Sequence, residues 1–68
     1  MVNTELLNAK IKESGLLRKY IAETLEITPV TLTRKVRGAN EFKPSEITKL
    51  CDILNISKKD VNSIFFAK

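Results

Sequence analysis

The 68-residue chain has no histidine, no tryptophan and one cysteine. A single cysteine cannot form a disulfide within the chain, and without histidine a zinc site of the usual Cys/His kind is excluded. No apolar run approaches the length of about 18 residues that a membrane span needs, and no signal-peptide pattern opens the chain. A lone thiol is typical of a reducing compartment. We therefore expect a cytoplasmic protein with no membrane partner.

A chain of this length forms one domain, residues 1–68, whose core is thin. Such a domain leaves little room for a large catalytic cleft. Glu23 and Glu26 are spaced like a carboxylate pair, but no histidine or second cysteine accompanies them. We expect no enzyme, no metal, no cofactor and no small-molecule ligand.

The chain has only two prolines and two glycines, and its apolar residues recur mostly at intervals of three and four. That spacing predicts an all-α fold, with five short helices near residues 5–14, 18–25, 29–36, 44–54 and 57–66. Helices this short are marginal in isolation, so they must share a core. The expected core residues are Leu7, Ile11, Ile21, Ala22, Leu25, Ile27, Leu32, Val36, Ile47, Leu50 and Leu54.

Polar residues and glycine mark where these helices begin and end. Asn3 or Thr4 can cap the first helix, and Gly15 is suited to stop it. Thr28, followed by proline, is a good N-cap for the third helix. Ser57 begins a sequence that resembles a capping box, with aspartate at the position of the usual glutamate.

The segment from Arg18 to Gly38 carries the most specific pattern. Only residues 26–28 separate the second helix from the third, and so short a turn forces two helices to cross steeply. Ala22 is small enough for the close approach, and Leu32 can point back from the third helix onto the second. The spacing predicts a helix-turn-helix.

Charge gives an independent signal, since the net charge is +4 and no acidic residue lies between Ile27 and Asn40. Six of the twelve lysines and arginines lie in or beside this stretch: Arg18, Lys19, Arg34, Lys35, Arg37 and Lys43. A cationic surface around one helix is what attraction to phosphates requires.

Residues 16–38, LLRKYIAETLEITPVTLTRKVRG, resemble the DNA-binding core of the Cro/repressor helix-turn-helix family, also called XRE-type. The helix from Ile47 to Leu54 fits the fourth helix of that family, and the ending Ile64-Phe65-Phe66 resembles small phage-type regulators. The resemblance implies a compact five-helix repressor-like domain, which binds double-stranded DNA and regulates transcription by occupying an operator.

The resemblance also implies a role for individual residues. The third helix would enter the major groove as the recognition helix. Its positions that match the family's base-edge contacts are Pro29, Val30, Thr31 and Arg34. Arg34 could bind guanine bidentately, and Val30 could contact a thymine methyl group. The expected contacts to the DNA backbone are Arg18, Lys19, Thr33, Lys35, Arg37, Asn40 and Lys43.

Three residues depart from the family pattern. Glu26 stands where the turn usually has a glycine in a left-handed conformation, and Leu17 stands where Thr or Ser usually caps the second helix. Lys35 occupies a position that is often apolar. This last departure leaves open whether Arg34 or Lys35 is the base reader.

The end of the chain bears on partners. One of Phe65 and Phe66 must pack inward, and the other is open to a dimer contact or to packing within the chain. Because a two-fold operator has two half-sites about one helical turn apart, it calls for two copies of the protein. We expect a weak homodimer assembled on DNA.

Two alternatives concern the function and the extent of the chain. The same fold can serve as a protein-interaction module, such as an antirepressor or antitoxin-type partner, although the acid-free stretch favours DNA. Met1 and the compact ending favour a complete protein over a fragment of a longer repressor. Cys51, on an apolar helical stripe, is expected to be a core thiol.

Overall fold

The computed structural model describes residues 2–66, so Met1 and the last two residues of the chain lie outside the described part. Within that part the chain is all-helical, without strands. The helices are α1 (Thr4–Ser14), α2 (Arg18–Thr24), α3 (Pro29–Val36), α4 (Pro44–Leu54) and α5 (Lys58–Phe65). Each lies within a few residues of its predicted range. No helix among the described residues is long and apolar enough to cross a membrane.

The predicted helix caps are present. The side chain of Asn3 accepts a hydrogen bond from the Leu6 N–H, and the side chain of Thr28 accepts one from the Thr31 N–H. Ser57 does the same for the Asp60 N–H at the start of α5. Gly15 ends α1 with a φ of 71°, in the left-handed region that glycine adopts without steric cost. Local sequence therefore sets most of the helix boundaries.

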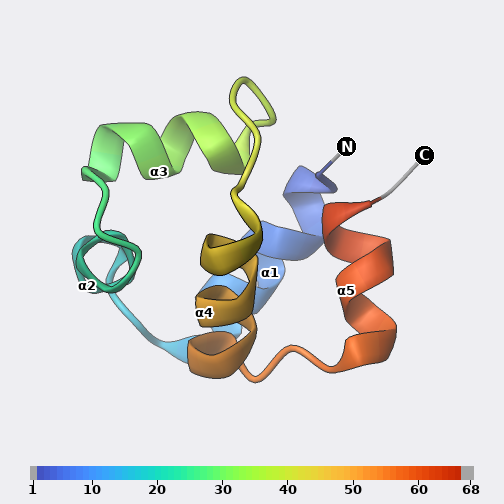
Figure 1. Cartoon of the computed structure of the whole chain (residues 1–68). Coiled ribbons are helices and arrows are strands. Elements are labelled where there is room, and N and C mark those ends of the chain that lie inside the picture. The colour runs from blue at the N-terminus through green and yellow to red at the C-terminus, as the bar shows by residue number, and fades with distance from the viewer. Residues whose placement is uncertain (1, 67–68) are drawn as a thin grey trace.

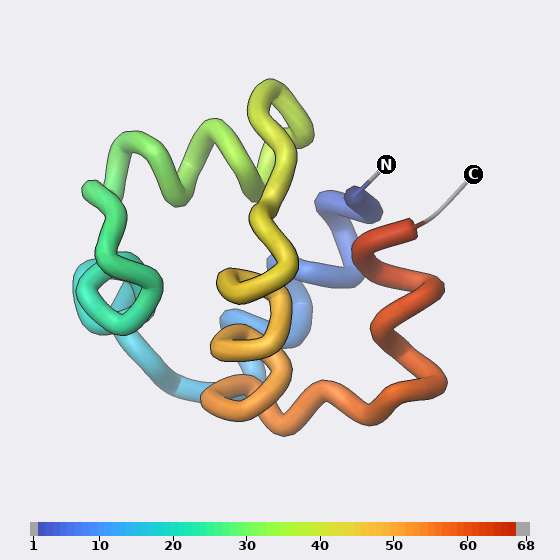
Figure 2. The backbone as a smooth tube through the Cα atoms, in the orientation of Figure 1, coloured from blue at the N-terminus to red at the C-terminus, as the bar shows by residue number. Residues whose placement is uncertain are grey.

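The helices are arranged around α4 (Figure 1). Helix α1 lies behind it, α5 lies to one side, and α2 and α3 lie to the other side and above. Helix α2 is seen end-on while α3 runs across the view, so the two helices cross steeply. The tube in Figure 2 shows the beginning of α1 close to the end of α5. The Asn3 N–H donates a hydrogen bond to the Ile64 carbonyl there, which ties the start of the chain to α5.

The core contains most of the predicted residues and three additions. Ile27 and Ile47 are only partly buried, whereas Ile56, Ile64 and Phe65 are buried. The ring of Phe65 meets that of Phe42 edge-on, with 5.5 Å between the ring centroids. Helix α5 thus completes the core, because its residues Ile64 and Phe65 pack in the same apolar cluster as the buried residues of α1 and α4.

Cys51 packs against this core but is only partly buried. Burial raises the pKa of its thiol, and the nearby Asp52 charge raises it further. The group is therefore a neutral thiol under ordinary conditions, in keeping with a packing role.

The connection between α2 and α3 runs through Glu26, which has a φ of 60°. The Glu26 and Ile27 N–H groups donate to the carbonyls of Glu23 and Ala22, so the turn is closed tightly onto the end of α2. A left-handed backbone brings the Cβ of a non-glycine residue close to its following carbonyl and costs roughly 1–2 kcal/mol. The sequence departure at Glu26 therefore places a strained residue in this turn.

Replacing Glu26 with glycine is expected to stabilise the domain. Relief of the strain exceeds the added chain entropy of glycine by about 0.5–1 kcal/mol. For a domain of this size 1 kcal/mol corresponds to roughly 4–8 °C in Tm, which thermal unfolding followed by circular dichroism would resolve. Asn55→Gly is the matched control, because Asn55 has a φ of 54° but asparagine tolerates that conformation. A lower Tm for Glu26→Gly would contradict the account of this turn.

Candidate nucleic-acid interface

Helix α3 has an outer and an inner face. We call the outer face the side formed by Val30, Thr33 and Arg34 of α3 together with its C-cap residue Arg37, because a period of 3.6 places these four residues on one side. Val30 is 64% exposed, and both arginines are exposed. The inner face is formed by Leu32, Lys35 and Val36, all buried. The outer face is available to a ligand, and the inner face belongs to the core.

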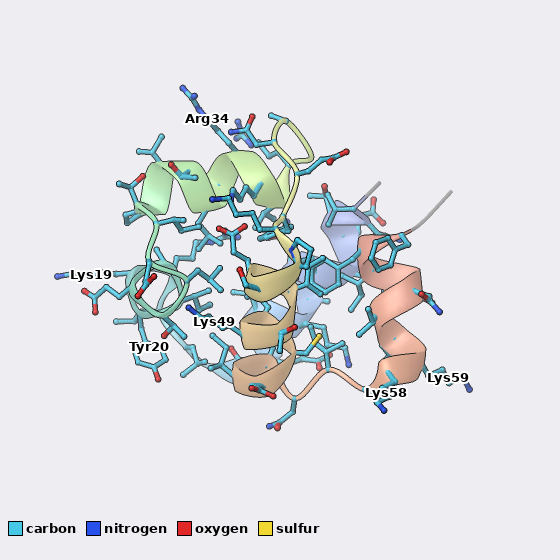
Figure 3. All side chains as sticks on the ribbon, in the orientation of Figure 1. Lys19, Tyr20, Arg34, Lys49, Lys58 and Lys59 are labelled. Atoms are coloured by element: carbon cyan, nitrogen blue, oxygen red, sulfur yellow. The ribbon has the colours of Figure 1, made fainter. Side chains whose placement is uncertain are left out.

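Arg34 and Lys35, the two competing base readers, lie on different faces. Figure 3 shows Arg34 pointing away from the body of the protein above α3. Among residues 2–66, neither Arg34 nor Arg37 is in an ion pair. Two unpaired guanidinium groups on one face, each with five donors, suit a phosphate or a base edge.

The expectation that Lys35 contacts the DNA backbone is wrong. Lys35 is only 7% exposed, and its Nζ lies 2.6 Å from Oε1 and 2.7 Å from Oε2 of Glu46 on α4. A phosphate cannot reach an ammonium group in this position. Lysine is accommodated at a position that is often apolar because its stem packs inside and its charge meets a buried carboxylate.

Glu46 is held from two sides. Its Oε1 also accepts a hydrogen bond from the Lys43 N–H at 2.8 Å, at the beginning of α4. Burial alone raises the pKa of this carboxyl, but the hydrogen bonds from Lys35 and the Lys43 N–H and the two lysine charges outweigh burial. The pKa of Glu46 therefore lies below its usual range, and the carboxylate is ionised at neutral pH.

The threonines of α3 differ in what they offer a ligand. The Thr28 hydroxyl donates to the Thr31 hydroxyl at 2.9 Å, which leaves the proton of Thr31 available for donation outward. The Thr33 hydroxyl already donates to the Pro29 carbonyl at 3.1 Å. Thr33 would have to give up that bond before it could donate to a phosphate, so Thr31 is the better donor of the two.

The predicted backbone contacts outside α3 are exposed but do not all point the same way. Arg18 donates from Nη2 to the Asn8 side-chain oxygen at 2.6 Å, so α1 helps to hold its guanidinium. Figure 3 shows Lys19 leaving α2 sideways, in a different direction from Arg34. Asn40 and Lys43 lie in the exposed segment between α3 and α4. Lys58 and Lys59, at the start of α5, lie far from Arg34 in the same view.

The two phenylalanines at the end of α5 differ in exposure: one is buried and the other is exposed. Phe65 is buried, so the expectation that it makes a dimer contact is wrong, whereas Phe66 is 58% exposed. Phe66 borders a groove of about 310 Å³, which Asn40, Phe42 and Phe65 also line. An exposed ring beside an apolar groove leaves Phe66 as the candidate for self-association.

Sequence reasoning missed two residues that hold side chains of the candidate site in place. Asn8 is a polar residue on α1 with no motif around it, and only the fold brings it to Arg18. Glu46 carries a local signal, since an acidic residue in the first turn of a helix is favourable, but nothing in that signal points to Lys35. Both act on a cation from another helix.

Comparison of the chain with protein-family models, with curated proteins and with solved structures finds no match.

Acid is expected to weaken the fold through Glu46. Because its pKa is lower in the folded state than in the unfolded chain, it contributes stability above the ordinary glutamate pKa of about 4.3. That contribution is lost as the pH falls through the folded pKa. Removing one partner alone would leave a buried charge unpaired, at a cost of about 3–5 kcal/mol, which is as large as the stability of such a domain.

The control is therefore a double variant, Lys35→Met/Glu46→Gln, which has no net charge change. Urea unfolding between pH 6 and 3 should show a steeper loss of stability in the unaltered protein than in the double variant. Equal pH dependence of the two proteins would contradict this role of Glu46.

Proposed function

We propose that this chain is a sequence-specific double-stranded DNA-binding regulator of transcription, of the Cro/repressor type. In this proposal α2 and α3 form a helix-turn-helix, α3 enters the major groove, and the protein acts by occupying an operator. The observation that carries the proposal is the outer face of α3. It combines an exposed apolar side chain, Val30, with Arg34 and Arg37, which form no ion pair with any residue in the described range 2–66.

The chemistry of this face suits a base-pair edge better than a protein surface. An arginine fork matches the O6 and N7 acceptors of guanine, and an exposed valine matches the thymine methyl group. A surface made for a partner protein would offer a contiguous apolar patch, but the neighbours of Val30 on this face are Thr33 and Arg34.

The surrounding exposed cations supply the contacts that hold the domain on the duplex. Arg18, Arg37 and Lys43 are exposed, and of these Arg18 is already oriented by Asn8. Contacts to phosphates position a protein without reading the sequence, and they make binding strongly dependent on salt. Because Lys35 is buried, it is not one of these contacts, and α3 with its C-cap residue contributes two cations, Arg34 and Arg37, instead of three.

Arg34→Ala and Lys43→Ala are expected to have different effects on DNA binding. Arg34→Ala should lower the preference for a selected site by roughly 1–3 kcal/mol and relax the consensus. Lys43→Ala should weaken selected and random duplexes about equally and reduce the salt slope by about one. Equilibrium binding to both duplexes over a salt series measures these effects.

A protein-interaction module would show little salt-dependent binding to random duplex, and that result would contradict the proposal. An unchanged consensus for Arg34→Ala would remove Arg34 as the base reader.

Phe66 is expected to join two copies on a two-fold operator. A self-association surface of one ring and one small groove is too small for a stable dimer in solution, but adjacent half-sites raise the effective concentration of the second copy. Phe66→Ala should abolish cooperative binding and leave Tm nearly unchanged. Phe65→Leu, the matched control, should lower the stability by roughly 1 kcal/mol and leave cooperative binding in place. Sedimentation with a two-half-site duplex measures the assembly, and one copy per duplex at saturation would contradict it.

A further inference from the structure

We propose that the buried Lys35–Glu46 pair is a positioning device that fixes the roll of α3 about its own axis and so decides which side chains face the DNA. The consequence for DNA rests on the proposed function. The orientation of α3 on the rest of the domain can be measured without DNA.

The apolar contacts of α3 define its roll only loosely. Successive helical residues are about 100° apart around the axis, so Leu32 and Val36, the apolar residues of the inner face, are separated by only about 40°. Lys35 lies about 60° from Leu32, on the side of Leu32 that is away from Val36. With the Lys35–Glu46 contact included, the part of the α3 circumference that contacts the rest of the domain therefore widens from about 40° to about 100°.

The pair also supplies a connection that backbone packing does not. Helix α3 packs mainly on α2 and α1, and the Lys35 side chain spans the distance to α4. Glu46 is fixed in turn, because its carboxylate also accepts the Lys43 N–H at 2.8 Å. The other polar tie on α3, from the Thr4 hydroxyl to the Val36 carbonyl at 2.8 Å, holds the end of the helix. Because a backbone carbonyl lies close to the helix axis, rotation of α3 about that axis moves it little, and this hydrogen bond therefore restrains the rotation only weakly.

Arg34, the proposed base reader, is adjacent to Lys35 in the sequence. A small rotation of α3 about its axis therefore displaces the Arg34 side chain directly. Side-chain tips lie about 6 Å from the axis, and a roll of 20° therefore moves them by roughly 2 Å. Hydrogen bonds tolerate a spread of only about 0.5 Å between donor and acceptor. Reading of bases depends on the roll, whereas attraction of arginines to the phosphates does not.

Stability alone does not explain a buried pair in so small a domain. Desolvation of both ions opposes the attraction between them, and neutral replacements of the whole pair are often tolerated. Lys35, on the inner face of α3, and Glu46, on α4, are nevertheless buried, with 7% and 5% of their surface exposed. A directional contact that fixes one arrangement accounts for their presence.

The test uses Lys35→Met/Glu46→Gln in the full 68-residue chain. The methionine keeps the apolar stem, and the glutamine keeps an acceptor for the Lys43 N–H. A second variant, Lys35→Leu/Glu46→Met, guards against a folding failure of the first. Lys10→Gln/Asp60→Asn is the matched control, because it removes the exposed Lys10–Asp60 pair, 3.5 Å apart between α1 and α5, with no net charge change.

Two quantities are measured for each protein. Residual dipolar couplings of the backbone N–H groups give the orientation of α3 relative to α1 and α4. Equilibrium binding gives the ratio of affinities for the selected duplex and a random duplex. We expect α3 to be reoriented and the ratio to fall roughly tenfold in the double variants. Random-duplex affinity and the control variant should be unchanged.

An unchanged orientation of α3, or an unchanged affinity ratio despite a reoriented helix, would overturn the proposal. If the unaltered protein itself shows no preference for any duplex, the proposed function fails. The dipolar couplings then decide the geometric claim alone, with reorientation supporting it and an unchanged α3 overturning it.

Discussion

One buried ion pair, between Lys35 on α3 and Glu46 on α4, constrains how α3 can sit on the rest of the domain. It occupies the inner face of the helix whose outer face carries Val30, Arg34 and Arg37. Because neighbouring residues of a helix are fixed about 100° apart, placing Lys35 inside places Arg34 outside. The same carboxylate holds the backbone at the start of α4 through the Lys43 N–H. A single buried charge therefore links the exposed helix to the central one.

The rest of the domain serves as a scaffold for α3. Thr28 caps its beginning, the Thr4 hydroxyl binds the Val36 carbonyl near its end, and Leu32 is fully buried beneath it. The short turn through Glu26 joins α2 to α3 where the two helices cross steeply. Helix α5 completes the core through Ile64 and Phe65. Both ends of α3 are thus hydrogen-bonded, its inner face is buried, and its outer face exposes Arg34 and Arg37.

The fold follows from the sequence to a large extent, because caps, glycines and apolar spacing are local signals. Glu26 also adopts the left-handed conformation that its place in the turn implied. The role of Lys35 could not be predicted, since its partner is eleven residues away and only the packing of α3 brings the two together. Phe65 and Phe66 are adjacent and chemically identical, so only the orientation of α5 separates the core ring from the exposed one.

Titration of the isotopically labelled protein with duplex DNA, followed by amide and arginine side-chain NMR signals, tests the central claim most directly. The account predicts that the signals of Val30, Thr33, Arg34 and Arg37 move first and furthest, with smaller changes at Arg18 and Lys43. Lys58 and Lys59, on the far side of the domain in Figure 3, should stay unchanged. Changes that cluster on α5, or no changes at low salt, would contradict the assignment of α3 as the DNA-binding helix.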